Sequence, residues 1–181
     1  MKPELPTVHT DLIVRCQRGD EQAFNDLYNL YGQMVWRLCA RMTISVTDAE
    51  DMAQEVWIQV WKQIGTYRCE SAFSTWLYKV TTNICLQQLR KQKRELVCSI
   101  DDMDQITTTC GNPVECINKE SVDSEITKLP ELLRLPLILR VYENLSYAEI
   151  ADILDCTTAA VKMRISRARM ALAKTLEVNI K

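Results

Sequence analysis

A chain of 181 residues, 47% hydrophobic and 25% charged, has the composition of an ordinary soluble globular protein and is long enough for one domain or two small helical ones. Glycine and proline are scarce and helix-forming residues are common, which favours an all-α fold. No apolar run approaches the roughly 20 residues that span a bilayer. Residues 1–10 also lack the apolar core of an export signal, so we expect a cytoplasmic protein without membrane insertion.

The sequence lacks the residue patterns of common catalytic and metal sites. None of the eight cysteines has CxxC spacing, and the only histidine is His9. A structural zinc site needs about four closely paired ligands, so we expect no metal and no cofactor. Most cysteines are predicted to be small buried hydrophobes in a reducing compartment. Without a glycine-rich phosphate loop or a nucleophile paired with histidine, the chain is not expected to be an enzyme.

Helical periodicity begins near Asp11 and continues to about Met42, which predicts two helices. Gly19 and Asp20 separate them, and Asp20 can cap the second helix. The first helix has a short apolar stripe formed by Leu12, Ile13 and Cys16. The second has a longer one, formed by Phe24, Leu27, Tyr28, Tyr31, Val35, Leu38, Cys39 and Met42.

A third helix, capped by Thr47 or Asp48, has two contrasting faces. Its apolar face comprises Ala53, Val56, Trp57, Val60, Trp61 and Ile64. The opposite face carries Asp51, Glu55 and Gln59, with Gln54 beside them, and residues 48–55 contain four acids and no base. The sequence therefore predicts one face packed in a core and one acidic face exposed.

Gly65 is predicted to end this helix, and a loop over 66–71 follows. The fourth helix starts near Ser71 or Ala72 and buries Phe73, Trp76 or Leu77, Val80 and Ile84. It continues into a basic tail, since residues 79–94 contain five bases and no acid. Residues 97–121 lack sustained periodicity and are rich in acids, which predicts a flexible linker.

The last third of the chain, from about Val122, is predicted to be helical again. Pro130 fits a helix start, and Pro136 should kink or restart the helix. Ser146 and Glu149 form a capping-box pattern before a short helix, and a tight turn over 155–157 follows. The final helix begins near Thr158, has five bases and no acid over 162–174, and buries Val161, Ile165, Ala168 and Leu172. This is a helix-turn-helix pattern, and the two basic stretches predict two contacts with a polyanion.

Three blocks in this order resemble the extracytoplasmic-function (ECF) group of the sigma-70 family of RNA polymerase sigma factors. They are residues 48–57, 71–85 and 145–169. A helix-turn-helix alone would also fit other regulators, so the order and spacing of the blocks make the resemblance specific. It implies two small helical domains: sigma region 2 over 10–95 and sigma region 4 over 122–178, joined by an acidic flexible linker over 96–121.

The resemblance also implies which residues bind polymerase and the −10 element. The acidic face would dock on the clamp helices of the polymerase β′ subunit, where charge complementarity favours it, through Asp51, Gln54 and Glu55. The loop over 67–71 would hold a flipped base, Asn83 would contact base edges, and the basic tail would bind phosphates. The −10 set is Tyr67, Arg68, Ser71, Lys79, Asn83, Arg90, Lys91 and Arg94. Whether Tyr67 stacks on a base or packs in the core is left open, whereas Phe73 and Trp76 are expected in the core.

The final block resembles sigma region 4.2, which reads the −35 element. The outward residues of its recognition helix are Thr158, Ala159, Lys162, Met163, Ser166, Arg167 and partly Arg164. The predicted −35 contacts are Thr158, Lys162, Met163, Arg164, Ser166 and Arg167. Two features depart from the family pattern. Ala159-Ala160-Val161 replaces the frequent Gly-Thr-Val, and Met163 occupies a position that is often polar, so the −35 sequence is not predicted.

By this resemblance the protein is a sigma factor that melts the −10 element and reads the −35 element. Its expected partners are core RNA polymerase (the β′ clamp helices and the β flap), promoter DNA and an anti-sigma factor. Two alternatives are a helix-turn-helix regulator that is not a polymerase subunit, and a sigma-like adaptor that has lost promoter opening. A further hypothesis is that the linker cysteines Cys98, Cys110 and Cys116 sense oxidation.

Overall fold

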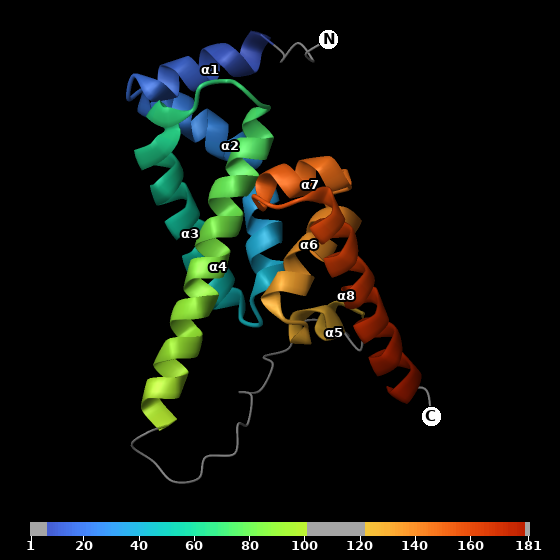
Figure 1. Ribbon diagram of the computed structural model, residues 1–181. Coiled ribbons are helices and arrows are strands. Elements are labelled where there is room, and N and C mark those ends of the chain that lie inside the picture. The colour runs from blue at the N-terminus through green and yellow to red at the C-terminus, as the bar shows by residue number, and fades with distance from the viewer. Residues whose placement is uncertain (1–6, 101–121, 180–181) are drawn as a thin grey trace.

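A computed structural model of the chain describes residues 7–100 and 122–179, with side chains over 10–92 and 124–175 (Figure 1). Over these residues the protein is built of helices without strands, as predicted. The elements in chain order are α1 (Thr7–Gln17), α2 (Glu21–Met42), α3 (Val46–Gln63), the 3₁₀ turn η1 (Ile64–Thr66), α4 (Phe73–Ile100), α5 (Val122–Lys128), α6 (Glu131–Val141), α7 (Tyr147–Ile153) and α8 (Thr158–Asn179).

The first four helices form one packed unit. Helix α2 packs against α3 and α4, and α1 lies across one end of this bundle (Figure 1). Apolar side chains recur at helical spacing on the inner faces, and the core includes fully buried Leu27, Leu38, Val56, Phe73 and Leu77. Leu77, and not the half-buried Trp76, therefore fills the inward position of α4 that the sequence left open.

The helix caps agree with the sequence at α2 and differ at α3. Asp20 accepts a hydrogen bond from the backbone N–H of Ala23 at 3.0 Å, as predicted. Helix α3, however, is capped by Ser45, whose hydroxyl accepts from the N–H of Asp48 at 3.4 Å. The expectation of a cap at Thr47 or Asp48 was wrong, because the helix begins two residues earlier and Ser45 has the extended backbone that a cap requires.

Two aromatic residues assigned to the core stand partly outside it. Tyr28 is 51% exposed and Trp61 is 40% exposed. Each still packs on a neighbouring ring: Trp61 on Phe24 with centroids 4.8 Å apart, and Tyr28 on Trp57 at 5.1 Å. The two rings cover the outer edge of the contact between α2 and α3. The apolar face predicted for each helix is therefore wider than its buried part.

Helix α4 is longer than predicted. It continues through Ile100, so residues 97–100, which were expected to belong to the linker, are helical. The chain contains no glycine or proline between Arg90 and Gly111 to end the helix earlier. The remaining linker residues, 101–121, lie outside the described residues, together with Cys110 and Cys116.

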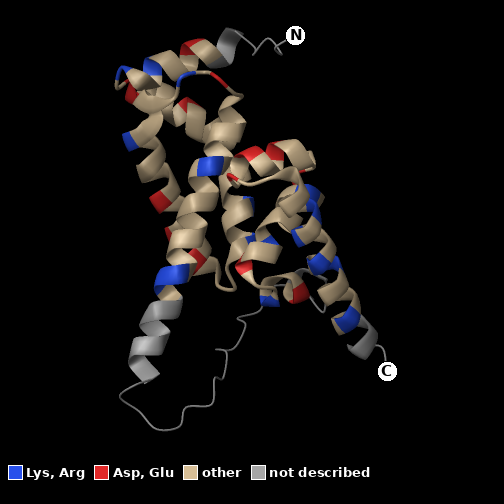
Figure 2. Ribbon diagram, in the orientation of Figure 1, with Lys and Arg blue, Asp and Glu red and all other residues tan. Residues whose placement is uncertain are grey.

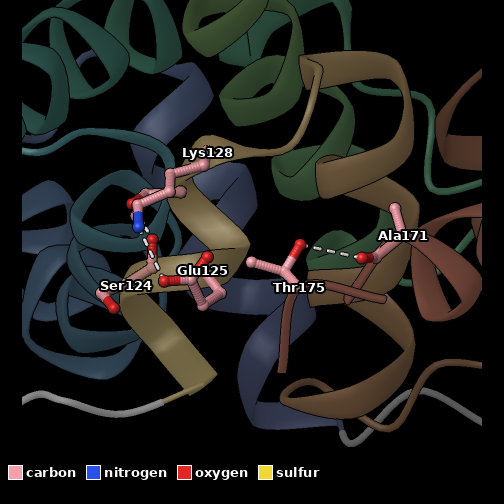
Figure 3. Close-up of polar contacts among 6 residues, drawn as sticks. Ser124, Glu125, Lys128, Ala171 and Thr175 are labelled. Atoms are coloured by element: carbon pink, nitrogen blue, oxygen red, sulfur yellow. Dashed lines mark hydrogen bonds and ion pairs between the residues drawn. The ribbon is translucent and has the colours of Figure 1, made fainter. Parts of the chain in front are cut away.

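Helices α5 to α8 form the second unit, in which α6 and α7 pack against α8. Helix α5 also lies against α8. Within α5 the ammonium of Lys128 contacts the carboxylate of Glu125 at 2.6 Å, and on α8 the Thr175 hydroxyl donates to the Ala171 carbonyl at 3.0 Å (Figure 3). Helix α6 is continuous through Pro136, so of the two predicted alternatives, a kink or a restart, the restart is excluded. Pro136 is buried, and because it has no N–H, one helical hydrogen bond is missing, the bond to the carbonyl of Leu132. Leu132 is exposed and lies in the first turn of the helix.

The helix-turn-helix forms as the sequence predicts. Ser146 and Glu149 make both bonds of a capping box, at 3.2 and 2.7 Å. Asp155 adopts a left-handed conformation (φ 47°) in the turn, and the Thr157 hydroxyl accepts from the N–H of Ala160 at 3.1 Å where α8 begins. Helix α8 buries the four predicted residues, Val161, Ile165, Ala168 and Leu172.

Replacing the cap residue, Ser146→Ala, is expected to lower the free energy of unfolding by about 0.5–2 kcal/mol. Hydrogen bonds from Ser146 hold the pKa of Glu149 below its ordinary value of 4.5. That contribution is therefore complete above pH 4.5 and is lost as the pH falls through the folded-state pKa. Urea unfolding at neutral and acid pH measures both effects, with Ser166→Ala on the exposed face of α8 as the control. Equal stability of both variants at neutral pH would contradict the capping role.

Candidate nucleic-acid interface

The acidic face of α3 forms as the sequence suggested. Asp51 and Gln54 are exposed and Glu55 is half-buried. The side-chain amide of Gln59 donates to the Glu55 carboxylate at 2.8 Å. Spacings of three and four residues place these side chains on one side of the helix. Glu55 is therefore held in place by its neighbour, and Asp51 and Gln54 are available to a partner.

The loop between η1 and α4 is closed by Tyr67. Its ring is 5% exposed and lies 5.4 Å from the ring of Phe73 and 5.6 Å from that of Trp76, between centroids. Its hydroxyl donates to the carbonyl of Ser71 at 2.6 Å, and burial raises the pKa of Tyr67 to about 12. Of the two alternatives left open for Tyr67, stacking on a base or packing in the core, the structure supports packing in the core. The Tyr67 ring is not on the surface, and it supports the loop from inside.

Polar side chains follow one another along the outer surface of α4. Lys79 is half-buried, and Asn83, Arg90 and Lys91 are exposed. The side chain of Arg94 lies outside the described residues. In the loop before α4, Arg68 is exposed and Ser71 is half-buried. The structure thus brings the described members of the predicted −10 set, other than Tyr67, to the loop and the outer surface of α4.

A cleft of about 730 Å³ separates this surface from the second unit. Glu55, Lys79, Asn83 and Arg90 lie on its first wall. Residues of α6 and α8, including Arg164, lie on the other. Members of all three predicted binding sets therefore meet around one cavity. This arrangement could not be predicted from the sequence, because helical periodicity says nothing about which units pack together.

Polar contacts bridge the two units beside the cleft. The buried Tyr78 hydroxyl donates to the Glu143 carboxylate at 2.7 Å, and burial together with this bond raises the pKa of Tyr78 well above its usual range. The Lys79 ammonium contacts the Asp152 carboxylate of α7 at 2.9 Å. A phosphate contact by Lys79 therefore requires this exposed ion pair to exchange. Sequence analysis missed Tyr78 and Glu143, which lie 65 residues apart.

Two buried polar atoms are left without a hydrogen-bond partner among the described residues: Nε of Arg134 and Oε1 of Glu143. Arg134 donates from Nη1 to the carbonyl of Thr127 at 2.7 Å, and burial lowers the pKa of its guanidinium. The Glu143 atom lies where the two units meet, on the carboxylate that accepts the bond from the Tyr78 hydroxyl.

Lys and Arg recur along the recognition helix α8 (Figure 2). Five of its predicted contact residues are exposed: Thr158, Lys162, Met163, Ser166 and Arg167. Arg164 is half-buried and its guanidinium lies 3.8 Å from the Cys156 sulfur, so it faces the turn and the cleft. Tyr147 supports the helix start, because its ring lies 5.7 Å from the Lys162 ammonium.

The described cysteines are free thiols. Cys16, Cys39 and Cys85 are buried as predicted, Cys156 is half-buried and Cys69 is exposed. A hydrogen bond with Cys39, together with burial, raises the pKa of Cys85. Cys98 lies on α4 with its side chain outside the described residues, and Cys110 and Cys116 lie outside the described residues altogether.

Among residues 7–100 and 122–179, no cluster of three or more histidine, cysteine, aspartate or glutamate side chains is arranged to hold a metal ion. The helices described over the same residues include none that is long and apolar enough to cross a membrane.

Two family models match the chain: sigma-70 region 2 over residues 27–95 and sigma-70 region 4 over residues 119–172. The ECF RNA polymerase sigma factor SigW of Bacillus subtilis is 32% identical over 176 residues, which cover 91% of this chain and 94% of SigW. The RNA polymerase sigma-H factor of Pseudomonas aeruginosa is 33% identical over 178 residues, covering 92% of each chain. The ECF RNA polymerase sigma-E factor of Escherichia coli K12 is 35% identical over 173 residues, covering 89% of this chain and 90% of its own.

Solved structures share the fold. One is CnrH in complex with the cytosolic domain of CnrY, with a TM-score of 0.66 and 21% identity over 92% of this chain and 96% of that one. Another is the sigma factor RpoE in complex with the anti-sigma factor NepR from Bartonella quintana, with a TM-score of 0.69 and 22% identity over 86% of this chain and 97% of that one.

Proposed function

Because this chain belongs to the ECF RNA polymerase sigma factors of the sigma-70 family, we propose that it binds core polymerase through α3 and starts transcription at promoters that α4 opens and α8 reads. The observation that carries the proposal is a single packed unit in which Glu55 of the acidic face on α3 lines the same cleft as Lys79, Asn83 and Arg90 of α4. A helix-turn-helix binds DNA in many classes of protein. The acidic face of α3 together with the polar surface of α4 couples a polymerase contact to a strand-separating surface.

In this proposal the two units bind different promoter elements and different parts of the polymerase. Residues 10–95 act as sigma region 2, which binds the β′ clamp helices and the −10 element. Residues 122–178 act as sigma region 4, which binds the −35 element and the β flap, and residues 96–121 connect them near the RNA exit path. The region 2 and region 4 models, which match 27–95 and 119–172, support this division.

At the −10 element, the loop over 67–71 receives a flipped base. Arg68 and Ser71 are the loop side chains that contact this base, and Asn83 contacts a base edge. Lys79, Arg90, Lys91 and Arg94 bind phosphates, which adds affinity that is independent of sequence. The carboxylate of Asp152 must first release Lys79.

We propose that the protein acts in the cytoplasm, performs no catalysis of its own, and is controlled by an anti-sigma partner. The sigma-factor relatives support the first two points. The third is supported by the solved structure of RpoE, a sigma factor bound to the anti-sigma factor NepR. The linker cysteines keep the status of a hypothesis, since they lie outside the described side chains.

Co-purification with core RNA polymerase separates this proposal from a helix-turn-helix regulator that is not a polymerase subunit. The tagged chain is mixed with core enzyme, and the complex is resolved by size-exclusion chromatography. We expect a one-to-one complex that survives at moderate salt. Elution of the chain apart from core at every salt concentration would favour the regulator instead. A chain that binds core without opening promoters would support the adaptor alternative.

Substitutions along α8 test the assignment of the −35 surface. Arg167→Ala should weaken holoenzyme binding to the −35 element by about 1–3 kcal/mol, the usual range for a lost base contact, and should relax specificity at one position. Lys174→Ala removes an exposed base further along the same helix and serves as the control. Competition binding with wild-type and single-base variants of the promoter measures both. Equal losses for the two variants at every sequence would mean that Arg167 contacts only phosphate.

A further inference from the structure

The loop that receives the flipped base is anchored at its start by a residue of another helix. The side-chain amide nitrogen of Gln17, at the end of α1, donates to the carbonyl of Ile64 at 3.0 Å and to the carbonyl of Tyr67 at 2.8 Å. Gln17 is half-buried, and η1 packs against α1 at this point (Figure 1). Both N–H groups of one amide are thus used on either side of the turn that leads into the loop.

The loop is also closed from within. The Ile64 carbonyl accepts a second bond, from the N–H of Tyr67 at 3.1 Å, and the Tyr67 hydroxyl donates to the Ser71 carbonyl at 2.6 Å. Between these two anchors, residues 68–70 are exposed, and Cys69 adopts a left-handed conformation (φ 56°). The tip therefore projects from a fixed base, and the placement of that base depends on Gln17 and Tyr67.

We propose that Gln17 is a positioning residue for base selection: its amide fixes the start of the 67–71 loop, and so determines how strictly the loop discriminates among flipped bases. This rests on the proposed function of that loop. Gln17 contacts no DNA in this account and acts through the carbonyls of Ile64 and Tyr67. Helix α1 lies outside the region 2 match, which begins at residue 27, so the match assigns Gln17 no role.

A donor requirement separates positioning from simple packing. Gln17→Leu keeps a side chain of similar size but has no hydrogen-bond donor. Gln17→Glu places a carboxylate against two carbonyl oxygens. Gln17→Arg keeps N–H donors on a longer stem. If Gln17 only fills space, Gln17→Leu should keep the wild-type discrimination and Gln17→Arg should lose it. If Gln17 positions the loop through its N–H groups, Gln17→Arg should keep the discrimination and Gln17→Leu should lose it.

The test uses holoenzyme assembled from the full chain and core polymerase, on a promoter obtained by run-off transcription of genomic fragments. Each non-template base of the −10 element is changed in turn to the other three, and the yield of open complex is measured by permanganate reactivity. Discrimination is the ratio of yields for the best and worst base at each position. Gln33→Leu, an exposed glutamine-to-leucine change on α2, is the matched control.

We expect Gln17→Leu and Gln17→Glu to lower discrimination at one position by roughly threefold to tenfold, the range that corresponds to a difference of one ordinary hydrogen bond between two bases. Gln17→Arg and Gln33→Leu should keep the wild-type ratio, and core affinity should not change. The proposal is overturned if Gln17→Leu keeps every ratio, if Gln17→Arg loses discrimination as Gln17→Leu does, or if yields fall equally at all bases. Absence of open complex with the unaltered chain would instead refute the proposed function.

Discussion

Reversing two charges on α3, Asp51→Lys with Glu55→Lys, is expected to abolish the complex with core polymerase. The proposed partner is a basic surface, and like charges brought together across an interface cost several kcal/mol, so affinity should fall by at least about 100-fold. Asp51 is exposed, and Glu55 is half-buried, lines the cleft and accepts a hydrogen bond from Gln59. The fold should therefore survive the change.

The control for this variant carries the same change in net charge at a distant place. Asp11→Lys with Glu21→Lys alters exposed residues on α1 and at the start of α2. Fluorescence anisotropy with labelled core polymerase gives the affinities, and circular dichroism reports folding. If both double variants lose the same affinity, the effect belongs to net charge, and the assignment of the α3 face is wrong.

The second large effect is expected in the aromatic core beneath the −10 loop. Phe73 is 2% exposed, and its ring lies 5.2 Å from that of Tyr31, 5.4 Å from that of Tyr67 and 5.4 Å from that of Trp76. Phe73→Ala should lower the free energy of unfolding by about 3–5 kcal/mol, because it removes a buried ring and leaves a cavity. That is a large fraction of the roughly 5–15 kcal/mol that holds a domain folded.

Urea unfolding followed by tryptophan fluorescence measures this loss, since Trp76 borders the cavity. Tyr28→Ala is the comparison, because Tyr28 is aromatic but 51% exposed, and its loss should be much smaller. Promoter opening by the Phe73 variant should fail at temperatures where core binding by α3 persists. Similar unfolding free energies for the two variants would contradict the view that Phe73 supports the loop.

Local patterns in the sequence were enough to predict most elements. The apolar stripe of α8, the capping box at Ser146 and the cap at Asp20 depend on residues within a few positions of one another, and each was confirmed. The error at Ser45 and the excluded restart at Pro136 are also local. At Ser45 two further cap residues were close by, and at Pro136 tertiary burial maintains a helix that proline propensity alone would interrupt.

Features that depend on distant segments could not be predicted. The burial of Tyr67 depends on Phe73 and Trp76 packing around it, and the contact of Tyr78 with Glu143 depends on how the two units meet. Gln17 is an ordinary polar residue at a helix end until the structure brings it to two carbonyls 47 and 50 positions away. The binding surfaces were therefore predicted as lists of exposed residues, whereas their anchors appear only in three dimensions.

Run-off transcription with purified core polymerase tests the central proposal most directly. Genomic fragments are transcribed by core alone, by core with this chain, and by core with the Asp51→Lys, Glu55→Lys variant. The account predicts discrete transcripts that start at fixed positions only when the unaltered chain is present, with melted DNA upstream of each start. Identical transcripts with and without the chain, on every fragment, would contradict it.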